Sequence, residues 1–161
     1  MAFATRADLL ARCNAQRLKL LAVPADRAML DSDTLRRLIE GGDASALDAE
    51  DQQTAALALD AIDKALDDAN ALLLSYGIPA TVESTLLARL SSTVAIYYLQ
   101  GAERMTEEVQ RAYDGVIKML TAFGRGELDL LPPDAALPAA PDDPVVIESA
   151  PPRYRGGVSC P

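Results

Sequence analysis

Residues 54–101 constrain the fold more than any other part of the chain. Their first half spaces apolar residues alternately three and four apart, which places one apolar stripe along a helix: Leu59, Ile62, Leu66, Ala69, Leu73 and Tyr76. Gly77 and Pro79 should end this helix, because glycine suits a left-handed C-terminal cap and proline cannot continue a helix. After Thr81 and Val82 a second stripe follows: Leu87, Leu90, Val94, Tyr97 and Tyr98. The pattern therefore predicts an antiparallel helical hairpin.

A third long helix is predicted after the hairpin. Thr106 is a good N-cap, Glu107 and Glu108 suit the positive end of the helix dipole, and Gly124 to Gly126 should end the helix. Its apolar positions repeat the same spacing: Val109, Tyr113, Val116, Leu120 and Phe123. Because short connections force successive helices to pack antiparallel, the sequence predicts an all-α, antiparallel helical bundle. Seven residues are expected to meet in its core: Leu66, Leu73, Leu90, Val94, Tyr113, Val116 and Leu120.

The residues before the hairpin predict short helical pieces that cover one end or side of it. Thr5 and Asp8 fit a capping box, and Asn14 could cap a further helix that stops before Pro24. Residues 31–33 offer caps for another short helix over 34–40. The first long helix is expected over 45–75, with Asp48 among the carboxylates in its first turns.

The composition changes abruptly after Gly126, since eight of the 10 prolines lie from Pro132 onward. We predict a helical domain over residues 1–126 and an extended, proline-rich C-terminal arm over 127–161. The arm carries an apolar, β-prone triplet and a basic-aromatic one, which are Val145, Val146 and Ile147, and Arg153, Tyr154 and Arg155. Such triplets are typical of a docking peptide that adds a strand or fills a groove in a protein partner. A tail with incidental apolar residues is the alternative.

Charge and composition narrow the functional class. A net charge of −9 argues against a nucleic-acid-binding surface, because phosphates require clustered lysine and arginine. Only 4% of the residues are aromatic and none is Trp, so alanine and leucine must fill the core. No apolar run is long enough to span a bilayer, and no secretory signal is evident at the N-terminus. Cys13 and Cys160 are expected to be free thiols in a cytoplasmic protein.

The search for catalytic chemistry gives no motif. The chain has no histidine, which removes the usual general base and metal ligand. Neither cysteine lies in a CxxC pair, and there is no glycine-rich phosphate loop. We therefore predict no enzyme activity, no cofactor and no metal. Four aspartates share a helix face at spacings that a metal site could also use: Asp60, Asp63, Asp67 and Asp68. Lys64 lies among them, so we predict a solvated face or one that meets a positively charged partner.

Several segments, in order, resemble the Mu-like phage head–tail connector proteins. Residues 61–79 (AIDKALDDANALLLSYGIP) look like the central helix of that family. Residues 97–103 are similar to its Tyr-x-Leu-Tyr-Gly-Asp segment, from which Gln100 and Ala102 depart. Residues 106–114 resemble its Pro-Glu-Glu-Val-x-x-Arg-Tyr-Asp pattern, with Ala112 inserted, and 120–127 resemble its Leu-x-x-Ile-Ala-x-Gly-Lys ending. Residues 8–12 and 152–154 also fit, whereas 24–50 do not.

The resemblance implies a structural virion protein in the neck between head and tail, assembled in the host's bacterial cytoplasm. Family members form a ring, usually a dodecamer, beneath the portal protein and above a downstream stopper or tail-terminator protein. DNA would pass through the ring without specific binding, and the acidic face described above would line this channel. The arm would meet the portal or a neighbouring copy. Two alternatives stay open: a small acidic interaction module, adaptor or inhibitor, for a basic protein partner, and an enzyme with an improvised carboxylate or cysteine site.

Overall fold

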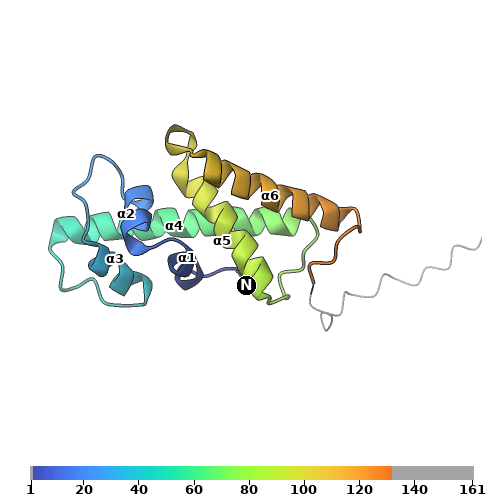
Figure 1. Ribbon diagram of the computed structural model, residues 1–161. Helices are drawn as coiled ribbons and strands as arrows, with labels where there is room; N and C mark the ends of the chain where they lie inside the picture. Colours follow the sequence, from blue (N-terminus) through green and yellow to red (C-terminus); the bar gives the residue numbers. More distant parts are fainter. Residues whose placement is uncertain (1, 132–161) are drawn as a thin grey trace, which may run out of the picture.

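The computed structural model describes residues 2–131, and every regular element in that range is helical (Figure 1). The all-α prediction is therefore confirmed. The elements follow one another as α1 (Arg6–Arg12), α2 (Ala15–Ala22), α3 (Ser32–Ile39), α4 (Ala49–Ser75), α5 (Thr85–Gln100), the 3-10 helix η1 (Ala102–Arg104) and α6 (Glu107–Gly124).

Helices α1, α2, α3 and α5 pack on the long helix α4, and α6 packs mainly on α5. In Figure 1, α5 crosses α4 diagonally and α6 turns back along α5, so the three principal helices alternate in direction. Small residues are buried on both helices of the hairpin, among them Ala58 and Ala69 on α4 and Ser91 and Ala95 on α5. The hydrogen bond between Ser91 and Asn70 lies where the two helices meet.

The core residues predicted from the stripes belong to one cluster. Leu66, Leu73, Leu90, Val94, Val116 and Leu120 are buried in it, and Tyr113 packs against it half-buried. The N-terminal helices also contribute fully buried leucines to this cluster, namely Leu9, Leu18 and Leu35. Helices α1–α3 therefore cover one side of the hairpin, as expected, and share its core.

One buried amide joins three separate segments. The side-chain oxygen Oδ1 of Asn70, on α4, accepts a hydrogen bond from the backbone N–H of Phe3 at 3.0 Å. The same oxygen accepts a second one from Ser91 Oγ on α5 at 3.3 Å. Since a buried polar group must be hydrogen-bonded to avoid a desolvation cost, Asn70 fixes the N-terminal segment against both helices of the hairpin.

Two predicted details are wrong. Helix α4 begins at Ala49, not at residue 45, because the side chain of Asp48 caps it by accepting from the N–H of Asp51 at 2.8 Å. Asp43 and Ser45 instead form a local turn ahead of the helix. Tyr98, predicted to face inward, is 37% exposed, since Tyr97 occupies the position that stacks on α6.

The C-terminal ends of α4 and α6 have the glycine turns that the sequence predicted. Gly77 has φ of +84°, the left-handed conformation expected at the end of α4, and the adjacent Ile78 is buried. Beyond α6, Gly126 has φ of +72°, and Leu130 then returns to the core with only 5% of its surface exposed. The division at residue 126 stays a prediction, and the packing of the body extends to Leu130.

Candidate interaction surfaces

The aspartates on α4 divide into paired and unpaired ones. Asp63 accepts two hydrogen bonds from the guanidinium group of Arg6. The distance from Nε to Oδ1 is 2.6 Å, and the distance from Nη2 to Oδ2 is 2.5 Å. These bonds from Arg6 lower the pKa of Asp63. Asp60 forms an exposed ion pair with Lys64 one turn along, at 2.7 Å. Both of these charges are therefore compensated within the chain.

Asp67 and Asp68 are exposed, and neither forms an ion pair with residues 2–131. Two large apolar side chains are also exposed on this helix, Leu57 (40%) and Leu74 (46%). We call this set the α4 outer face: Leu57, Asp60, Asp67, Asp68 and Leu74. Across the described part of the chain, no three acidic or cysteine side chains are grouped so that they could hold a metal ion.

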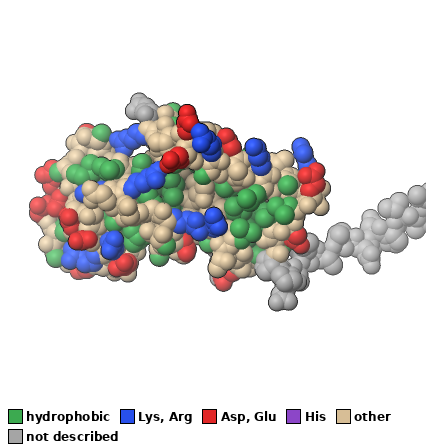
Figure 2. Space-filling model, in the orientation of Figure 1, with side chains coloured by type: hydrophobic (Ala, Val, Ile, Leu, Met, Phe, Trp, Pro, Cys, Tyr) green, Lys and Arg blue, Asp and Glu red, His purple; other side chains and the backbone are tan. Residues whose placement is uncertain are grey.

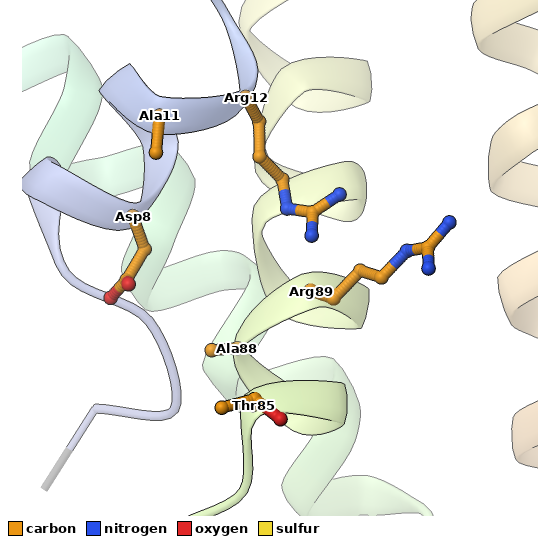
Figure 3. Close-up of a pocket in the computed structure, with 6 residues that line it drawn as sticks. All are labelled: Asp8, Ala11, Arg12, Thr85, Ala88 and Arg89. Carbon is orange, nitrogen blue, oxygen red and sulfur yellow. The ribbon is translucent and has the colours of Figure 1, made fainter.

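The second surface is a concavity between α1 and α5, which the sequence analysis did not identify. It has a volume of about 530 Å³, and we call it the arginine cleft, with this lining: Asp8, Ala11, Arg12, Thr85, Ala88 and Arg89. Figure 3 shows the guanidinium groups of Arg12 and Arg89 extending to the same side, while Asp8 points away from them. No local pattern connects these arginines, because only the packing of α1 on α5 brings them together.

Neither arginine of the cleft has a carboxylate partner within the described residues. The nearby Asp8 is already engaged, since its carboxylate accepts from the N–H of Thr5 at 2.8 Å and from the Thr5 hydroxyl at 2.6 Å. These bonds from Thr5, more than the charge of Arg12, lower the pKa of Asp8. The predicted capping box is thereby confirmed. The cleft thus presents two guanidinium groups that form no ion pair within the described residues, beside one carboxylate, Asp8, that is hydrogen-bonded to Thr5.

One face of the molecule carries basic groups and hydrophobic patches side by side. In Figure 2, basic groups lie near the middle of the face that is drawn, with hydrophobic patches on either side of them. A partner that contacts this face would meet basic and apolar groups together. Such a mixture is typical of protein–protein interfaces, in which arginine is enriched.

A third surface is a cluster of tyrosines where α5 approaches α6. The rings of Tyr97 and Tyr113 stack with centroids 3.9 Å apart, and Tyr98 packs edge-on against Tyr97 at 5.8 Å. Burial raises the pKa of Tyr98, and Tyr113 and then Asp68 add to this shift. Tyr98 therefore lies near Asp68, which belongs to the α4 outer face.

The predicted docking residues of the arm, Val145 to Ile147 and Arg153 to Arg155, lie outside the described residues. Among residues 2–131, no helix combines the length and the apolarity needed to cross a membrane.

A protein-family model matches most of the chain. The sequence model of the family described as Bacteriophage Mu, Gp36 matches residues 3–149. This range includes all of the helices and extends through Val145, Val146 and Ile147, but it ends before Arg153. No curated protein matches the chain.

Proposed function

The chain belongs to the bacteriophage Mu Gp36 family, and from this premise we propose that it is the head–tail connector of its virion. Membership of this family indicates that the chain is a phage structural or morphogenesis protein. The connector role is the finer proposal, and the observation that carries it is the family match along the whole helical body.

In this proposal, copies of the chain form a ring beneath the portal and extend the channel through which DNA leaves the head. A ring usually matches the symmetry of the portal on which it assembles, so we expect twelve copies. The net charge of −9 supports this role, because negative charge lets DNA pass without being held. A stopper or tail-terminator protein would bind the opposite side of the ring.

The arm would attach the helical body to the portal or to a neighbouring copy. Val145, Val146 and Ile147 would pair as an added strand or lie in an apolar groove, and Arg153 and Arg155 would meet carboxylates beside a pocket for Tyr154. The prolines around these residues restrict the unbound chain, so that less conformational entropy is lost on docking. The inclusion of the apolar triplet in the family match supports a role for that part of the arm.

The proposal is tested in the virion. Particles assembled without this protein should fill with DNA and accumulate as tailless heads, and adding the purified protein should restore tail attachment. Electron microscopy of complete particles should show a ring of this protein between portal and tail. Normal tailed particles in its absence would refute the connector role. A soluble 1:1 complex with a basic protein, and no copies in the particle, would favour the interaction module instead.

A further inference from the structure

We propose that neighbouring copies of the chain pack head to tail, with the α4 outer face of one copy against the arginine cleft of the next. Asp67 and Asp68 would then lie opposite Arg12 and Arg89 in the contact between subunits, in place of the channel-lining position that the family resemblance implied for them. This inference rests on the proposed ring and identifies the interface between its subunits.

Asp67 and the arginine cleft lie on different sides of the helical hairpin, whereas Asp68 leaves α4 at its side, about 80° around the helix from Ala58. Asp67 is nine residues after the buried Ala58, or about 2.5 helical turns, so the two side chains leave α4 in opposite directions. Helix α5 packs on the buried side of α4, and Arg89 is exposed on α5 between the buried residues Leu87 and Leu90. An interface between different sides of identical subunits is heterologous, and it generates a ring when the rotation closes.

The chemistry of the two surfaces is complementary. Within residues 2–131, the two guanidinium groups of the arginine cleft form no ion pair, and neither do Asp67 and Asp68 on the α4 outer face, where the cation Lys64 pairs with Asp60. Guanidinium and carboxylate groups match in planar geometry and can form paired hydrogen bonds. Each surface therefore offers what the other lacks.

Both surfaces also expose apolar side chains that association would remove from water. Leu57 and Leu74 flank the aspartates of the α4 outer face. Leu86, at the start of α5, is 38% exposed, and Ala11 and Ala88 line the arginine cleft. The α4 outer face thus combines leucine with negative charge, and the arginine cleft combines alanine and a nearby leucine with positive charge. These two combinations would form one continuous contact. DNA phosphate is a poorer occupant of the cleft, because two arginines on a chain of net charge −9 neutralise few phosphates.

The test reverses the charge on each surface. One variant carries Arg12→Glu and Arg89→Glu, and the other carries Asp67→Lys and Asp68→Lys. All four side chains are exposed, so circular dichroism should show an unchanged fold. Sedimentation velocity and cross-linking of the full chain should show self-association of the wild type, and association at least about tenfold weaker for each variant alone, because like charges then face each other.

An equimolar mixture of the two variants should regain association. In the mixture, the intact α4 outer face of the first variant meets the intact arginine cleft of the second, and lysine of the second meets glutamate of the first. A matched control with Lys118→Glu and Arg125→Glu changes the net charge as much as the arginine variant but alters exposed residues near the end of α6, outside both surfaces. It should associate like the wild type.

Three results would overturn the interface. If both variants associate like the wild type, the surfaces are wrongly assigned, whereas a ring seen by electron microscopy would still support the connector role. A wild-type chain that stays monomeric at every concentration would exclude this self-contact, and particle microscopy would decide the connector role separately. If only the arginine variant is impaired and it also loses retention on double-stranded DNA, the cleft binds phosphate and not a second copy.

Discussion

Asn70 shows how much of this small fold depends on single buried polar atoms. Its side-chain oxygen accepts hydrogen bonds from Phe3 and from Ser91, which belong to the N-terminal segment and to α5. An apolar residue of similar size would fill the same space but satisfy neither donor. Individual residues of this kind fix the register between elements whose general packing is set by hydrophobic burial.

Replacing Asn70 with leucine should lower the free energy of unfolding by about 1–3 kcal/mol, because two donors lose their acceptor in a buried site. Urea denaturation monitored by circular dichroism measures this difference. Ser91→Ala is the matched control, since it removes one donor and leaves the bond to Phe3 in place, and its loss should be smaller. Equal stability of Asn70→Leu and the wild type would show that these bonds do not stabilise the fold.

The ion pair between Arg6 and Asp63 should make stability depend on pH. Hydrogen bonds from Arg6 lower the pKa of Asp63, so the pair stabilises the protein above the unfolded pKa of about 4 and loses its effect as the pH falls through the lower folded value. Both side chains are over one-third exposed, at 36% and 44%, so solvent screening limits the effect to below about 1 kcal/mol.

The comparison that isolates this pair is wild type against Arg6→Gln. The wild type should be the more stable at pH 7, and the gap in unfolding free energy should narrow as the pH falls below about 4 and Asp63 becomes protonated. Urea denaturation at several pH values measures the gap. A gap that is constant with pH would mean that Arg6 contributes through packing alone.

At the scale of elements, the sequence predicted the helices well because their signals are local. Spacings of three and four along 59–76 and 87–97 report directly on which side of a helix is buried, and Thr106 caps α6 as expected, accepting from the N–H of Val109. The start of α4 was missed because Ser45 and Asp48 are both plausible caps, and only the structure shows which side chain accepts hydrogen bonds from the helix N–H groups.

Contacts between distant residues could not be predicted in the same way. Arg6 and Asp63 are 57 positions apart, and Arg12 and Arg89 become neighbours only because α1 packs on α5. No periodicity within one helix contains that information. The aspartates of α4 were recognised as a group, but their division into paired and unpaired members depends on those tertiary contacts.

The hairpin core gives a prediction at this scale. Leu66→Ala and Leu90→Ala should each lower the unfolding free energy by about 2–5 kcal/mol, because each deletion leaves a cavity between buried helices. Leu74→Ala is the matched control on the same helix, since Leu74 is 46% exposed, and its thermal midpoint should stay close to that of the wild type. If all three variants had the same thermal midpoint, the assignment of helix faces would be wrong.

For the whole molecule, the question is where the helical body ends and the proposed docking arm begins. The packing of the body extends past Gly126 because Leu130 is buried in the core. A truncation that removes Leu130 would therefore alter the body as well as the arm. The two roles can be separated by choosing the end point on either side of this residue.

A chain that ends after Leu131 should keep the helical content and thermal midpoint of the full protein but fail to join portal-containing particles. A chain that ends after Glu127 should fail in the same assay and also melt at a lower temperature, because burial of Leu130 is lost. Co-sedimentation with particles and thermal denaturation measure the two effects. Normal incorporation of the chain ending after Leu131 would show that the helical body alone provides the attachment surface.

The stacked tyrosines at the junction of α5 and α6 also give the protein an intrinsic optical reporter. With no tryptophan, five tyrosines and two weakly absorbing phenylalanines in the chain, its near-ultraviolet spectrum comes mainly from tyrosine, and the ring pair Tyr97–Tyr113 joins two different helices. A change in the angle between α5 and α6 on ring assembly would alter the near-ultraviolet circular dichroism while the far-ultraviolet signal of the helices stays constant. Assembly of the proposed ring from purified protein could thus be followed without attaching a label.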